Sequence, residues 1–255
     1  MVKDNSNIYS DTEQHSIKKS VILHLFPGIL ILLFYIITAP FMIRLGLPSL
    51  FAILLAILFI LIPFELGYLL HQGKKKNGRF SLSGIVLYRE KIPIWQYFIF
   101  VPVLLSWSIT VFLLISPPID NYLIRTLFSW LPNWFFYLDD YVNNISLYSK
   151  SALVVTWIFG LVLNGVIGPI VEELYFRGYL LPRISRLKWW SPLINALLFS
   201  LYHFFTPWQN PARILALLPM TYAVWWKRNI YLSIFMHCLL NTGSMFMTLP
   251  LILGS

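Results

Sequence analysis

The chain of 255 residues is 58% hydrophobic and only 11% charged, with a mean hydropathy of +0.71. A soluble domain carries about 25% charged residues, so this composition excludes a soluble enzyme, a disordered protein and a nucleic-acid-binding domain. The net charge of +9 does not change this conclusion, because the basic residues are scattered between apolar runs. One transmembrane helix needs about 20 apolar residues. The sequence therefore predicts an all-α, polytopic membrane helix bundle of about seven or eight transmembrane helices.

The apolar runs give the predicted helices in chain order, at about 21–43, 49–70, 95–116, 151–187, 190–205, 212–226 and 229–250. The run 151–187 is too long for one simple crossing at about 1.5 Å per residue. Gly165, Gly168 and Pro169 interrupt it, which predicts either one long kinked helix or two helices. The aromatic segment 119–137, interrupted by Pro132, is predicted to be an interfacial or loop element.

Basic residues predict the orientation. With the N-terminus inside, 14 of the 19 lysines and arginines fall on the cytoplasmic side, among them Lys74–Lys76, Arg79, Arg183 and Lys188. Arg44, Arg125, Lys150 and Arg213 are then expected in outer connections. This distribution favours seven crossings, with 151–187 as one helix. The polar segment 1–20 is predicted to be cytoplasmic, 21–150 to hold the first helices and an interfacial loop, and 151–250 to form the functional core.

Charged residues inside membrane spans are disfavoured by about 2.5–3.5 kcal/mol each and are functional candidates by default. Three pairs here share a spacing of four residues, which places both members on one helix face. These pairs are Glu173 with Arg177, Phe199 with His203, and His237 with Asn241. Counting from the nearest basic residues puts Glu172, His203 and His237 at depths of roughly 16, 22 and 14 Å. We therefore expect the three groups to converge near the middle of the membrane.

Two chemistries fit such a cluster. A buried carboxylate and imidazole can activate a water for attack on a carbonyl, while a second imidazole and an amide stabilise the oxyanion. Alternatively, Glu172, His203 and His237 supply the ligands of an open zinc site. Both readings favour hydrolysis of a peptide bond in the membrane. For each pair taken alone, an interhelical ion pair or polar contact is the competing interpretation.

The motifs Glu172-Glu173-Leu-Tyr-Phe-Arg177, Phe199-Ser-Leu-Tyr-His203 and His237-Cys-Leu-Leu-Asn241 together resemble the signature of the CAAX prenyl endopeptidase and bacteriocin-processing family of intramembrane proteases. The resemblance extends from about Ile167 to Thr242. It implies that Glu172 and His203 activate water, that His237 and Asn241 stabilise the oxyanion, and that Glu173 and Arg177 support the site. The sequence has no His-Glu-x-x-His motif, which is the commonest zinc-protease pattern. Whether zinc is bound is left open.

The resemblance implies a membrane-associated peptide or lipidated protein as substrate and membrane lipid as surroundings, with no nucleic-acid partner. A bacterial plasma membrane is the favoured location. The alternative function is a non-enzymatic bacteriocin-immunity or transport-type protein that uses the same polar cluster for binding. Outside the motifs, Glu65 is expected at the inner end of the second span, where snorkelling explains it as well as function does. His24 is expected near the inner interface, and Cys238 as a small buried hydrophobe.

Overall fold

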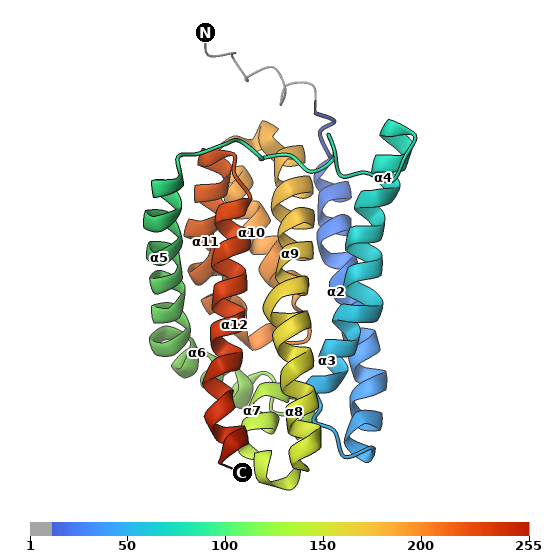
Figure 1. Ribbon diagram of the computed structural model, residues 1–255, viewed down its shortest axis with the longest axis vertical. Helices are drawn as coiled ribbons and strands as arrows, with labels where there is room; N and C mark the ends of the chain where they lie inside the picture. Colours follow the sequence, from blue (N-terminus) through green and yellow to red (C-terminus); the bar gives the residue numbers. More distant parts are fainter. Residues whose placement is uncertain (1–11, 255) are drawn as a thin grey trace.

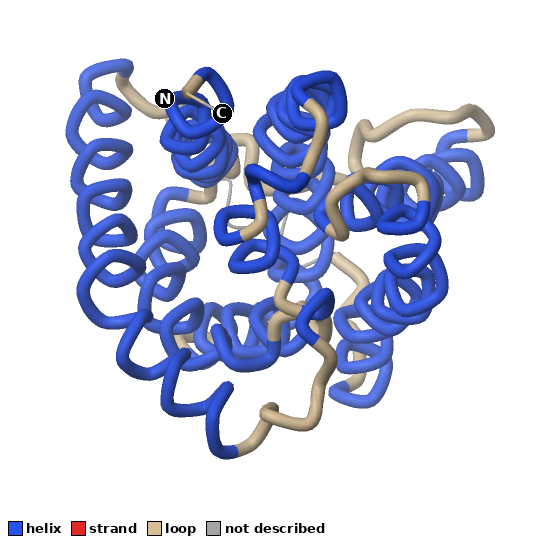
Figure 2. The backbone as a smooth tube through the Cα atoms, turned by 90° about the horizontal axis from the view of Figure 1, so that it is seen from below, coloured by secondary structure: helices blue, strands red, loops and turns tan. Residues whose placement is uncertain are grey.

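The computed structural model describes residues 12–254, and within them the chain is helical apart from its connections and one isolated bridge between Arg89 and Asn229. Figure 1 shows the long helices side by side along one axis, and Figure 2 shows the same bundle end-on. The all-α class is confirmed. Of the predicted cytoplasmic segment 1–20, residues 1–11 lie outside the described part.

Five continuous helices in the described residues are long and apolar enough to cross a membrane, which makes the chain a multi-pass membrane protein. They are α2 (Ile17–Arg44), Leu50–Asn77, Ile94–Thr126, Lys150–Leu187 and α12 (Tyr231–Leu253). The second consists of α3 (Leu50–Ala56), the π-helical η1 (Ile57–Leu66) and α4 (Gly67–Asn77); the third of α5 (Ile94–Thr110), η2 (Val111–Ile115) and α6 (Ser116–Thr126). Seven or eight crossings are not confirmed.

The two remaining long helices are α10 (Trp190–Tyr202) and α11 (Asn210–Lys227), which match the predicted runs 190–205 and 212–226. At about 1.5 Å per residue, the 13 residues of α10 span only about 20 Å, less than the hydrocarbon core. The two helices pack against each other and bury small side chains such as Ala196 and Ala216. Each helix also has exposed side chains, such as Leu197 and Leu215, so one face of each is buried, and that face carries residues toward the site described below.

The segment 119–137 is only partly the predicted loop. Residues up to Thr126 are helical, because α6 continues the third long helix without a break. The rest forms a connection with the short 3-10 helix η3 (Asn133–Phe135), followed by α7 (Tyr137–Asn143) and the 3-10 helix η4 (Ile145–Leu147). Pro117 and Pro118 lie where η2 passes into α6, and the helix continues through them although neither can donate an N–H.

The predicted interruption in 151–187 is a change of helix type within one continuous helix. Its parts are α8 (Lys150–Phe159), η5 (Gly160–Ile167), α9 (Gly168–Glu172), η6 (Glu173–Leu180) and η7 (Leu181–Leu187). Pro169 has no N–H to donate to the carbonyl of Gly165, four residues earlier. The Thr242 hydroxyl of α12 donates to that carbonyl instead, at 3.2 Å. Gly165 permits this approach, because a Cβ there would lie 3.0 Å from Thr242 Oγ1.

The contact between α2 and α10 fixes the end of α10. A Cβ at Gly28 would lie 1.9 Å from the Tyr202 carbonyl oxygen, so only glycine lets the two helices meet this closely. His24 of α2 is fully buried between the same two helices. Its Nε2 accepts a hydrogen bond from Asn195 at 3.0 Å, and its Nδ1–H donates to the Ser20 carbonyl at 2.7 Å. The paired imidazole lets a polar residue lie inside the bundle without an unsatisfied group.

Candidate active site

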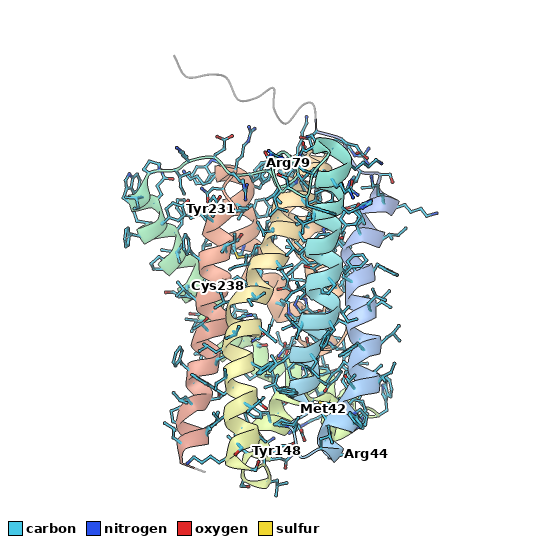
Figure 3. The ribbon with its side chains drawn as sticks, turned by 45° about the vertical axis from the view of Figure 1, so that its right-hand side comes forward. Met42, Arg44, Arg79, Tyr148, Tyr231 and Cys238 are labelled. Atoms are coloured by element: carbon cyan, nitrogen blue, oxygen red, sulfur yellow. The ribbon has the colours of Figure 1, made fainter. Side chains whose placement is uncertain are left out.

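A cavity of about 610 Å³ lies within the bundle, and four of the six predicted site residues line it. Glu172 comes from α9, His203 from the residue after α10, and His237 and Asn241 from α12. Figure 3 places Cys238, the neighbour of His237, between Tyr231 toward one end of the bundle and Tyr148 toward the other. The remaining two residues, Glu173 and Arg177, are not in the cavity wall and are fully buried. Three separate helical segments thus bring their polar groups to one space.

Glu173 and Arg177 form a buried ion pair on η6. Arg177 Nη1 lies 3.2 Å from Glu173 Oε1, and both side chains are 0% exposed. The guanidinium also lies over the Phe199 ring, with 3.9 Å from Cζ to the ring centroid, which adds a cation–π contact. The carboxylate and the ring together offset the charge of Arg177 inside the bundle.

His237 is oriented by the same carboxylate. Its Nδ1–H donates to Glu173 Oε1 at 2.9 Å, since a carboxylate in an ion pair can only accept. The other ring nitrogen, Nε2, therefore faces Glu172 Oε2, at 3.9 Å. A fixed tautomer and a fixed ring direction are what a reacting imidazole requires. Glu173 thus acts on the cavity through His237.

His203 has its own orienting contact. Its Nδ1–H donates to the Phe199 carbonyl at 2.8 Å, which leaves Nε2 without a proton in the neutral ring. The residue stands directly after the last turn of α10, with backbone angles outside the helical region. The motif pair Phe199 and His203 is therefore joined by a side-chain-to-backbone hydrogen bond, and His203 itself lies just beyond the helix on which both were predicted.

Asn241 connects the cavity to the helix Lys150–Leu187. Its Nδ2 donates to the Asn164 carbonyl at 3.0 Å, in the stretch whose backbone bonds are loosened before Pro169. An amide nitrogen has two N–H groups, so one remains for another acceptor. Cys238, predicted to be a buried hydrophobe, is half-buried, and its Sγ lies 3.8 Å from the neighbouring carbonyl of Val166.

Snorkelling and function explain Glu65 equally well from the sequence, and the burial of its side chain disfavours snorkelling. The side chain lies on η1, is 0% exposed, and neither carboxyl oxygen has a hydrogen-bond partner. It interacts electrostatically with Glu172, and the buried hydroxyl of Tyr202 lies near both carboxyls. The sequence around Glu65 is like that at the end of other apolar spans, so it does not mark a functional residue. The packing of η1 against α9 brings Glu65 near Glu172.

The sequence assigns Arg213 to the outer side, and the structure shows its side chain buried within the bundle at the start of α11. The side chain is 7% exposed and lines the same cavity as Glu172 and His203. Charge counting cannot detect such a residue, because a basic residue near the start of a helix has the same sequence signature whether it faces water or a cavity. The signal that was available is its position between two of the motifs.

A metal site needs several donor side chains close together. Among residues 12–254, no three His, Cys, Asp or Glu side chains lie close enough together to hold a metal ion. Glu172 and His237 approach each other, but His203 does not complete a ligand group with them. The residues as placed do not fit a zinc site.

The fold and cavity define a multi-pass membrane bundle with a buried carboxylate–imidazole site. Residues 154–243 match the family model described as type II CAAX prenyl endopeptidase Rce1-like, which confirms the resemblance carried by the three motifs. The match covers less than half of the chain. Comparisons with curated proteins and with solved structures gave no match.

Proposed function

We propose that the protein is an intramembrane endopeptidase that hydrolyses a peptide bond with a water activated by Glu172 and His203. The observation that carries this proposal is the convergence of Glu172, His203, His237 and Asn241 on one cavity inside the bundle. The family match of residues 154–243 supports a peptide as substrate.

In the proposed reaction, the unprotonated Nε2 of His203 and the Glu172 carboxylate hold a water molecule. One proton of this water passes to them as its oxygen bonds to the substrate carbonyl carbon. The remaining amide N–H of Asn241 donates to the oxyanion that forms, and His237 donates to it from Nε2 when both ring nitrogens carry a proton. The C–N bond then breaks, and the proton taken from water goes to the leaving amine. Glu173 and Arg177 keep His237 in position throughout.

The walls of the cavity indicate a substrate that enters from the membrane. Apart from the site residues they are largely aliphatic and aromatic, and several wall residues, among them Leu113 and Met247, are also exposed on the outside of the bundle. A membrane-associated peptide or lipidated protein meets this description. We place Lys74–Lys76 and Arg79 on the cytoplasmic side of a bacterial plasma membrane, and Figure 3 shows Arg79 and Arg44 at opposite ends of the bundle.

The proposal is tested by membrane peptide mass spectrometry in strains that carry wild-type, Glu172→Ala or His203→Ala protein. We expect each substitution to reduce cleavage by at least about 100-fold, while membrane insertion is unchanged. A matched control is Cys238→Ala, next to His237 but outside the cavity wall, which is expected to cleave normally. Wild-type behaviour of both site variants would instead favour the non-enzymatic immunity or transport role.

A further inference from the structure

The cavity of the proposed active site is built from one half of the bundle. Within the described chain, the second of the five long helices contributes wall residues only between Leu50 and Leu61. The fourth long helix contributes none beyond Glu172, and α12 contributes none before His237. Figure 1 shows α7, α8 and the C-terminal end of α12 together at one end of the bundle. The cavity therefore extends from the middle of the bundle toward this end.

Most of the exposed basic residues lie at the other end. Figure 3 places Arg79 at that end, whereas Arg44 and Tyr148 lie at the end toward which the cavity extends. We call it the basic end and define it by Lys74–Lys76, Arg79, Arg186, Lys188, Lys227 and Arg228. The positive-inside rule assigns a basic end to the cytoplasm. On this rule the cavity extends toward the non-cytoplasmic face of the membrane.

Packed side chains close the cavity on the side of the basic end. Phe176, Arg177 and Leu180 follow Glu172 along the same helix, and each of the three is 0% exposed. The Phe176 ring packs against the rings of Phe199 and Tyr202, with 4.9 Å between the centroids in each pair. Protein interiors of this kind are close-packed and leave no path for a peptide backbone or for its water.

The opposite side of the cavity is lined by short segments that carry polar groups. Tyr137 and Tyr141 come from α7, and Thr206 and Gln209 come from the connection between α10 and α11. None of these residues belongs to one of the five long helices. Polar side chains in a membrane bundle characteristically line a water-filled cavity. These segments therefore mark the side from which water reaches Glu172.

Sideways entry from the lipid is the competing route. The wall residues Leu113 and Met247 are exposed on the outside of the bundle. Leu113 belongs to η2, which leads into α6 and away from the basic end, and Met247 lies near the C-terminal end of α12. A substrate that enters between these two residues also comes from the non-cytoplasmic half of the membrane. Both routes thus lead to the same face.

We infer that the site receives its substrate from the non-cytoplasmic side, so that the substrate is a membrane-bound peptide exposed on that face and not the tail of a cytoplasmic protein. The half-bundle cavity, its closed layer at the basic end and the positive-inside rule carry this inference together. It rests on the proposed function, because it names the class of substrate that the same site receives.

The test measures from which face a thiol in the cavity reacts. The full-length chain with Cys238→Ala is expressed in bacterial cells and carries one new cysteine, either Asn164→Cys in the cavity wall or an exposed control. The controls are Ser83→Cys, after α4, and Ser146→Cys, in η4. The reagent is a membrane-impermeant trimethylammonium methanethiosulfonate. We expect Asn164→Cys and Ser146→Cys to react at least about tenfold faster in spheroplasts than in inside-out vesicles, because hydrocarbon excludes a cation, and Ser83→Cys to show the reverse.

Faster reaction of Asn164→Cys in inside-out vesicles, or of Ser83→Cys in spheroplasts, would overturn the inference. Thr248→Cys is a second wall position and decides in the same way if Asn164→Cys does not fold. Peptides that accumulate with Glu172→Ala are expected to be digested by proteinase K added to intact cells, and their protection would also overturn it. Labelling of the cavity from outside in a chain for which no peptide accumulates would retain the outward opening and reject the protease.

Discussion

The two buried arginines of the site region differ in how their charges are offset. Arg177 lies within the η6 segment, where Glu173 and the Phe199 ring compensate it and the pair is closed to the cavity. Arg213 lies on α11 with four neutral acceptors and faces the cavity. The family motifs contain the first arginine and not the second.

This difference distinguishes charged groups that orient other side chains from charged groups that face the cavity or lie next to it. Glu173 and Arg177 form an ion pair that orients His237, so any effect they have on the proposed reaction is indirect. Arg213 and Glu65 lack a close charged partner in the described chain, and each lies near Glu172. Natural proteins place such stability costs at functional sites.

The largest expected effect is on the compensated arginine. Arg177→Met leaves the Glu173 carboxylate buried without its cation, and we expect a loss of about 3–5 kcal/mol in the free energy of unfolding. Thermal unfolding in detergent measures it, and the double variant Glu173→Gln with Arg177→Met should recover most of the loss. In contrast, Arg213→Met should cost no more than about 1 kcal/mol, because water in the cavity can satisfy its former acceptors. Equal losses for the two arginines would remove the distinction.

Glu65 extends the comparison to a buried acidic side chain. Its carboxyl is fully buried and makes no hydrogen bond, so Glu65→Leu removes an unsatisfied group from the interior. We expect the free energy of unfolding to rise by about 1–3 kcal/mol. Leu69, one turn further along the same helix and equally buried, supplies the control, since Leu69→Ala should lower stability by about 2–5 kcal/mol. A lower melting temperature for Glu65→Leu would show that the carboxyl has a stabilising partner.

His15 tests a buried titratable group far from the cavity. Burial, together with Lys19 and Arg183, lowers the pKa of His15 to about 4, while Glu13 opposes the shift. The segment around it is anchored by the His15 N–H to the Arg183 carbonyl at 2.8 Å, and the ring packs against Tyr179. Because the docked form binds fewer protons, its stability is constant above about pH 6.5 and falls as the pH decreases toward 4.

The expected loss at His15 is up to about 2 kcal/mol at pH 5. Amide hydrogen exchange in residues 13–16 at pH 7 and pH 5 measures this change, after correction for the intrinsic rates. His15→Phe should remove the pH dependence. Unchanged protection between the two pH values in the wild-type chain would contradict the assigned pKa.

The smallest effect is expected at the hydrogen bond between α12 and the helix Lys150–Leu187. Thr242→Val removes the hydroxyl that donates to the Gly165 carbonyl and leaves that carbonyl without a donor. Interhelical hydrogen bonds in membranes contribute about 0.6–1.7 kcal/mol, so we expect a loss of about 1 kcal/mol in unfolding experiments. Thr248→Val is the control, because the Thr248 hydroxyl bonds within its own helix. A similar loss in both variants would show that the contact to Gly165 is not special.

The sequence predicted the helices well because long apolar runs have few alternatives in a membrane. All seven runs are helical, and the effect of Pro169 on 151–187 followed from its missing N–H. The number of spans was not predictable from these runs, since α10 is long enough for a helix but too short to cross. The motif spacing placed Glu172, His203, His237 and Asn241 on faces that the structure brings together.

The burial of Glu65 and Arg213 beside the site was not predicted, because distance along the chain indicates depth but not which side chains meet. Glu65 reaches the site from a helix without a motif, through the packing of η1 against α9. Arg213 folds back from the start of α11 onto the end of α10. Both positions depend on contacts between segments that are distant in sequence, and no periodicity encodes those contacts.

The central claim is that the cavity around Glu172 and His203 hydrolyses peptide bonds. The most direct measurement is cleavage of a membrane-associated peptide by the purified full-length chain in water enriched in oxygen-18, with the products analysed by mass spectrometry. We expect one labelled oxygen atom in the new carboxyl group of the N-terminal product and none in the C-terminal product, and a rate at least about 100-fold lower for Glu172→Gln. Labelled product formed at the wild-type rate by Glu172→Gln, or a cleaved peptide without label, would contradict the account.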